Sequence, residues 1–111
     1  MKNYKELLIW QKGIDLVQEI YELSKLLPAG EKYGMISQMT RAAVSIPANI
    51  AEGSGRNTTP DYARSLDMAL GSAFELETYL VIIKQMNWVA DEQVGKANAL
   101  LQEELKMIYA C

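Results

Sequence analysis

Acidic side chains three residues apart on a helix are the one arrangement in this sequence that could hold a catalytic metal. All-α nucleotide pyrophosphatases bind magnesium with Glu-x-x-Glu pairs on two adjacent helices. Glu19 and Glu22 have this spacing, but they fall on the polar side of their predicted helix and no second pair faces them. Glu103 and Glu104 are predicted to be a surface charge pair. We therefore expect no metal site, no catalytic residue and no enzyme, and keep magnesium-dependent nucleotide hydrolysis as a third alternative.

Other familiar sites are excluded by what the chain lacks. It contains no histidine, which rules out a Ser-His or Cys-His nucleophile, an imidazole zinc ligand and a Glu-x-x-His di-iron site. Its one cysteine, Cys111, cannot form an internal disulfide. The Gly53-Ser54-Gly55 run lacks the lysine and the preceding strand of a phosphate-binding loop. No cofactor is expected.

One acid is predicted inside an apolar helix face. On the helix expected over 59–86, Glu77 lies in the middle of the apolar side. A buried carboxylate needs a cationic partner or stays protonated. The guanidinium groups available are those of Arg41, Arg56 and Arg64. We expect a structural ion pair or network here, with a functional acid as the alternative.

Hydrogen-bonding side chains follow the outer face of the helix predicted over 34–52. Most are short or bidentate groups, unlike the Lys/Glu mixture on the helix predicted over 7–27. A solvated face is the first interpretation, and a polar contact with another chain or a ligand is the alternative. With two acids of the third helix, the candidates for a structural polar network are Gln38, Arg41, Ser45, Asn49, Glu52, Glu75 and Glu77.

Length and composition indicate a globular domain. The chain has 111 residues, of which 50% are hydrophobic and 23% charged, a balance typical of folded proteins rather than disordered ones. No apolar run approaches the roughly 20 residues that a membrane-spanning helix needs. The first six residues contain an acid and no small-residue cleavage site, so no signal peptide is predicted. We expect a cytoplasmic protein.

Apolar residues recur at helical spacing in four segments, which predicts an all-α protein. The connections between these segments are short, and short connections make consecutive helices antiparallel neighbours. The sequence therefore predicts an up-down antiparallel four-helix bundle that forms a single domain over 1–111. Its helices are expected at about 7–27, 34–52, 59–86 and 91–109.

Several residues mark the expected helix ends. Gly53 is placed as the residue that follows the second helix, Thr59 as the N-cap of the third and Asp91 as the cap of the fourth. Pro47 lies inside the second helix, where proline removes a backbone donor and clashes with the preceding turn. We therefore expect a kink or a break near Pro47.

Two helices carry more apolar surface than one small bundle can bury. The apolar face of the first helix covers about half of its circumference, against roughly 100° for an ordinary surface helix. Gly71 lies in the middle of the third helix, where glycine costs about 1 kcal/mol relative to alanine, and this suggests close approach of another backbone. We expect a homo-oligomer. The candidates for its interface are Trp10, Ile14, Val17, Tyr21, Met68 and Gly71.

The charge of the chain bears on nucleic-acid binding. Proteins that bind phosphate backbones usually carry a basic surface. This chain has a net charge of −3 and a pI of about 4.9, which argues against such a partner. Arg56 and Arg64 nevertheless flank the second loop, and a ring of copies would bring several of these arginines together. Nucleic-acid contacts through these two residues are the alternative function.

Several segments together resemble one known family. They are 10–13, 33–34 with 37–38, 41–53 and 71–77, and the most specific is Ser-Ile-Pro-Ala-Asn-Ile-Ala-Glu-Gly, which ends at Gly53. These segments resemble the bacterial "four helix bundle protein" family, first known from open reading frames inside intervening sequences of 23S ribosomal RNA genes. The similarity spans about residues 4 to 110.

The resemblance implies an up-down four-helix bundle that assembles as a homopentamer around a central channel. It also implies distant kinship with the accessory variability determinant of diversity-generating retroelements, a basic pentamer that works with reverse transcriptase and nucleic acid. The present chain differs from that relative in being acidic. The family has no established enzymatic activity. The expected function is thus a non-enzymatic pentameric scaffold or interaction protein, whose physiological partner the sequence leaves open.

Overall fold

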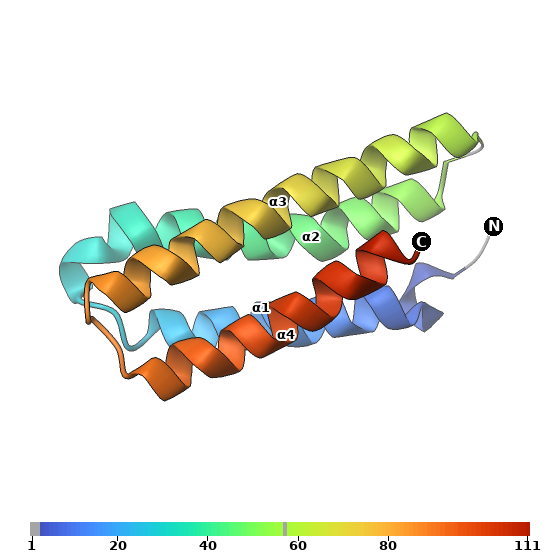
Figure 1. The fold of residues 1–111 in the computed structure, drawn as a ribbon. Helices are drawn as coiled ribbons and strands as arrows, with labels where there is room; N and C mark the ends of the chain where they lie inside the picture. The colour runs from blue at the N-terminus through green and yellow to red at the C-terminus, as the bar shows by residue number, and fades with distance from the viewer. Residues whose placement is uncertain (1–2, 57) are drawn as a thin grey trace.

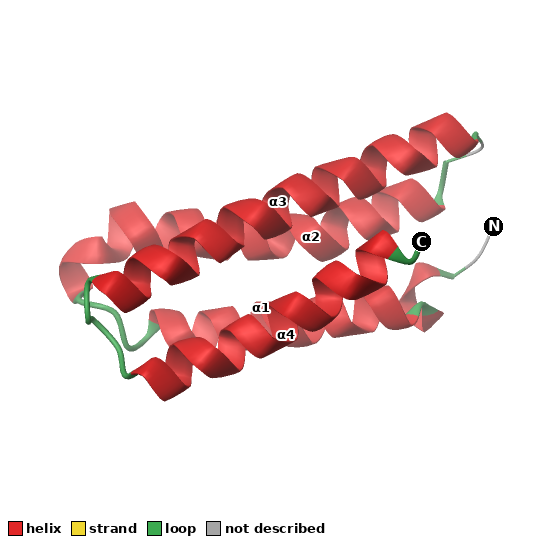
Figure 2. Ribbon diagram, viewed as in Figure 1, coloured by secondary structure: helices red, strands yellow, loops and turns green. Residues whose placement is uncertain are grey.

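Four long helices run side by side and alternate in direction (Figure 1). The computed structural model describes residues 3–56 and 58–111, and Figure 2 shows no strand among them. Each helix packs against the next one in the chain, and the first also packs against the last. The predicted all-α, up-down antiparallel bundle is confirmed. The helices are α1 (Leu8–Ser24), α2 (Ser37–Ser54), α3 (Thr59–Gln85) and α4 (Asp91–Tyr109).

Short helical turns complete the bundle. A 3-10 turn, Tyr4–Glu6, precedes α1, and another, Ala29–Glu31, leads into a π-helical turn, Lys32–Ile36, before α2. The whole molecule measures 44 × 24 × 19 Å. None of the helices in the described residues is both long enough and apolar enough to cross a membrane.

The core is built from the apolar stripe that each helix was predicted to carry. Large aliphatic side chains from all four helices are fully buried along the length of the bundle, and each contributes about 1.5–3 kcal/mol by leaving water. The core includes Leu16 and Ile20 of α1, Met39, Ile46 and Ile50 of α2, Ala73, Leu76 and Ile83 of α3, and Ala97, Leu101 and Ile108 of α4.

The predicted break at Pro47 is wrong, because α2 continues as one helix from Ser37 to Ser54. Two side chains in the same stretch bond to helix carbonyls: Ser45 Oγ donates to Ala42 O and Asn49 Nδ2 to Ser45 O, each at 2.8 Å. A bend of the axis at Pro47 stays a prediction. The non-helical backbone lies before α2, at Gly34, whose φ of −105° and ψ of −108° interrupt the π-helical turn.

Three helix ends differ slightly from those expected. Gly53 does not follow α2 but lies buried within it, and Gly55 is the C-cap. Thr58, one residue before the predicted cap, accepts a hydrogen bond from the Asp61 amide at 3.3 Å at the start of α3. Asp91 is the first residue of α4 and not its cap. Glycine at 53 is required by packing, because α3 passes too close for a side chain.

Replacing Gly53 by alanine is expected to destabilise the protein by about 1–3 kcal/mol, the usual cost of overpacking. The new Cβ would lie 2.8 Å from Ser65 Cβ and 3.2 Å from Tyr62 Cδ1. Gly95→Ala is the matched control, because a Cβ there meets no side chain or neighbouring helix of the described chain within 4 Å and Gly95 lies outside the predicted interface. Helix propensity should then stabilise it by up to about 1 kcal/mol. Urea unfolding compares the two, and equal effects would contradict close packing at Gly53.

Candidate functional site

The residues predicted to form one polar network do not make a single chain of hydrogen bonds but form separate contacts on α2 and α3. Tyr79 of α3 donates its hydroxyl proton to Gln38 Oε1 of α2 at 3.3 Å. Burial raises the pKa of the Tyr79 phenol, and the neighbouring Glu75 carboxylate raises it further. Gln38, Tyr79 and Glu75 therefore form a small cluster that joins α2 to α3. Tyr79 was not among the predicted residues, although its place on the same row as Glu75 could have indicated it.

The other predicted polar residues of α2 mostly bind their own helix. Ser45 and Asn49 donate to helix carbonyls, and Glu52 forms an ion pair with Arg56 four residues later. Arg41 is exposed and forms no ion pair within residues 3–56 and 58–111. The outer face of α2 is thus largely a solvated helix surface in the isolated chain, with Arg41 as its available cation.

Glu77 differs from the prediction in burial and in partner. It is half-buried, and its carboxylate accepts a hydrogen bond from Gln102 Nε2 of α4 at 2.5 Å instead of pairing with an arginine. The same amide nitrogen lies 3.2 Å from Asn98 Oδ1. These three side chains line a groove between α3 and α4 that also contains Lys84 and Asp91. Glu77 is therefore joined to α4 by a hydrogen bond from an uncharged side-chain amide, and this bond links the two helices.

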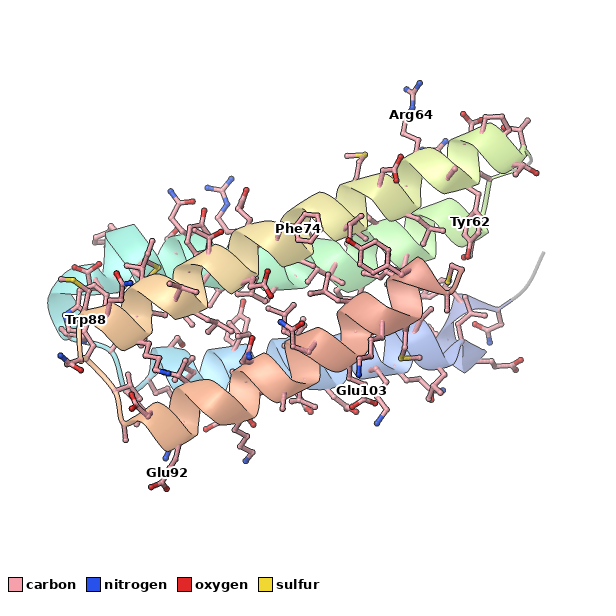
Figure 3. The ribbon with its side chains drawn as sticks, in the orientation of Figure 1. Tyr62, Arg64, Phe74, Trp88, Glu92 and Glu103 are labelled. Carbon is pink, nitrogen blue, oxygen red and sulfur yellow. The ribbon has the colours of Figure 1, made fainter. Side chains whose placement is uncertain are left out.

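Glu104 is fully buried, although it was predicted to lie on the surface. Its neighbour Glu103 does point away from the bundle (Figure 3), 3.2 Å from Lys12 Nζ. The Glu104 side chain, by contrast, is 0% exposed, and neither of its carboxyl oxygens has a hydrogen-bond partner in the described chain. The signal was available, because Glu104 follows Leu101 by three residues and precedes Ile108 by four, on the apolar seam of α4.

Three helices meet at the Glu104 carboxyl. A Cβ added to Gly13 of α1 would lie 2.9 Å from Glu104 Oε2 and 3.3 Å from Pro47 Cβ of α2. The Glu104 carboxyl therefore occupies the space that a side chain at position 13 would need. Burial, followed by the charge of Glu103, raises the pKa of Glu104 to about 8. The carboxyl is consequently protonated at neutral pH.

The predicted interface residues differ in exposure. Tyr21 is 47% exposed and Met68 56%, while Gly71 is exposed and Trp10, Ile14 and Val17 are half-buried on α1. Tyr21 also shares a concave surface with Thr40, Arg41, Val44 and Ser45 of α2. Ile82 of α3 and Met86, the C-cap residue of that helix, extend the exposed row that begins at Met68. Their role in an interface between copies stays a prediction.

The remaining candidates are separate charged groups. Arg64 is exposed and points away from the bundle near the start of α3 (Figure 3), whereas Arg56 is held by Glu52. Glu19 and Glu22, the acids with magnesium-site spacing, lie near Lys96 and Lys25 at 3.4 and 3.2 Å. Within the described part of the chain, no three acidic or cysteine side chains gather as metal ligands.

Comparisons with known proteins agree with the resemblance found in the sequence. The model of the 23S rRNA-intervening sequence protein family matches residues 5–110. Among solved structures, the fold is similar to a protein of unknown function from the S23 ribosomal protein family of Bacteroides thetaiotaomicron. The TM-score is 0.86 and the identity 27%, over 93% of this chain and 96% of that one. No curated protein matches the chain.

The contact between Glu77 and Gln102 is expected to contribute about 1–2 kcal/mol, in the range of hydrogen bonds to partly exposed charged groups. Glu77→Ala, Gln102→Ala and the double variant form a thermodynamic cycle, measured by urea unfolding. Asp67→Ala, an exposed acid on the same helix, is the control and should change stability by less than about 0.5 kcal/mol. Additive effects of the two single substitutions would contradict the contact.

Proposed function

We propose that this chain, which belongs to the 23S rRNA-intervening sequence protein family, is a non-enzymatic, cytoplasmic scaffold that works as a homopentamer. The observation that carries the proposal is the apolar surface left accessible on α1 and α3. The number of copies, five, rests on the family resemblance. The absence of catalysis is likewise part of the proposal.

The placement of the two apolar surfaces supports a ring. Each helix packs mainly against its neighbours in the order α1, α2, α3, α4, and α1 also packs against α4. Helices α1 and α3 are therefore diagonal to one another, and their outer faces lie on different sides of the bundle. A cyclic ring uses two different, complementary patches on every copy, whereas a two-fold dimer uses one patch twice.

Charge complementarity supports the same arrangement. Arg41 borders the concave surface that holds Tyr21 and Val44, and it has no ion-pair partner in the described chain. Glu75 lies on α3 between Met68 and Ile82 and is exposed. If one copy places its α3 row against the α1–α2 surface of the next, an arginine and a glutamate become available to pair. Such pairs fix register more than they add affinity.

Light scattering after size exclusion is expected to give about five times the 12.4 kDa chain mass at micromolar concentration. Met68→Lys should lower that mass, because it places a charge on the exposed apolar row of α3. Leu26→Lys is the matched control, since Leu26 is 49% exposed but lies outside the predicted interface. A monomer mass for the unaltered protein would end the proposal. Equal disruption by both variants would reject the α3 row as the interface.

Nucleic-acid binding is the second candidate function. The observation that favours it is Arg64, which is exposed, points into solvent and forms no ion pair among the described residues. Arg56 lies at the same end of the bundle, and its charge is partly neutralised by Glu52. Copies of these side chains in a ring would produce a local positive potential despite the net charge of −3.

A salt-titrated binding assay with a single-stranded and a double-stranded RNA or DNA probe tests this second candidate. Arg64→Ala should weaken binding and reduce the slope of log affinity against log salt by about 1. Arg56→Ala should have a smaller effect, because its charge is already paired. Lys106→Ala, on the exposed side of α4, is the control cation. An affinity that changes neither with salt concentration nor with the Arg64 substitution would exclude the proposed contact.

A further inference from the structure

Glu104 is a buried acid whose surroundings offer nothing to an anion. Pro47, which faces it from α2, carries no backbone N–H. Gly13, which faces it from α1, has no side chain, and its N–H lies within a regular helix turn. A carboxylate taken out of water needs donors or a cation to offset the loss of hydration. Only the neutral acid fits this position.

The charged groups on the surrounding helices do not compensate. Glu103, next to Glu104 on α4, adds repulsion, while Lys12 of α1 is 3.2 Å from Glu103. On α2, Arg41 is exposed and Glu52 pairs with Arg56. On α3, Glu77 is bound by the Gln102 amide. Within the described residues, no cation pairs with Glu104.

The carboxyl is fully enclosed inside the bundle. Its Oε2 atom is 2.9 Å from the place where a Cβ of Gly13 would stand, and Pro47 Cβ is 3.3 Å from the same place. An ionised Glu104 can regain water only if α4 separates from α1 and α2 around it. Ionisation and the docking of α4 are therefore mutually exclusive at this point.

We propose that Glu104 is a proton-controlled lock, which holds α4 against α1 and α2 while its carboxyl is neutral and loosens the bundle when it ionises. The folded-state pKa of about 8, raised by burial from 4.5, places the ionisation of the docked carboxyl just above neutral pH and the loss of stability between these two values. Because the folded-state pKa is raised, this contribution to stability is complete below the unfolded-state value. It is lost as pH rises through the folded-state value. The inference does not depend on the proposed oligomer.

Urea unfolding between pH 5 and pH 9, at one fixed protein concentration, compares the unaltered protein with Glu104→Gln. Relative to that variant, the folded-to-unfolded ratio of the unaltered protein should fall about tenfold per pH unit across this window until it levels off near pH 8. Glu103→Gln is the matched control, an exposed acid one residue away, and should keep most of this pH dependence. The protection factors of the α4 amides, which are corrected for the intrinsic rise of exchange with pH, should fall in the unaltered protein over the same range and stay level in Glu104→Gln.

The result that would overturn the proposal is a pair of parallel stability curves for the unaltered protein and Glu104→Gln. Should the glutamine variant fail to fold, a carbon-13 NMR titration of the Glu104 carboxyl in the unaltered protein decides the question. A midpoint near 8 supports the lock, and a midpoint near the ordinary 4.5 rejects it. A change in oligomer mass does not affect that midpoint test, so this proposal and the proposed function can fail separately.

Discussion

The fold depends on the close approach of α1, α2 and α4 around Gly13. The missing side chain at this residue lets the Pro47 ring and the Glu104 carboxyl share one small space. Since α1 packs against both α2 and α4, this contact closes the bundle on that side. The buried Pro47 ring gains apolar contact there, which offsets part of the cost of a proline inside α2. The same close packing disfavours a charged carboxylate at Glu104, because it leaves no room for water or a cation.

Much of the fold could be predicted because its signals are local. Apolar residues spaced three and four apart define the buried stripe of each helix, and the fourth helix was predicted over the same residues that the structure gives it. Helix starts and ends were placed within a few residues of those observed, because proline, glycine and threonine constrain the backbone where they stand. The family resemblance agrees with the match over residues 5–110.

The candidate sites were harder to predict because their character depends on a different helix. Glu77 and Glu104 both lie close to an apolar seam, and the angle around the helix does not distinguish them. Glu77 is half-buried beside Gln102, whereas Glu104 enters the space that Gly13 leaves empty. The two glycines Gly53 and Gly71 pose the same difficulty. One faces Ser65 at overlapping distance and the other faces no neighbouring helix, although both stand inside helices.

The chain places a polar group in its core and apolar groups on its surface, the reverse of the usual distribution in a small bundle. An acid lies in the core, while aliphatic and aromatic side chains remain on the outer faces of α1 and α3. The acid lies among α1, α2 and α4, and the exposed row from Met68 to Met86 lies on α3, diagonal to α1. The exposed row and the Glu104 carboxyl are therefore carried by different helices, α3 and α4. The proposed association and the proposed protonation of Glu104 can thus be tested by separate substitutions, one set on α3 and the other on α4.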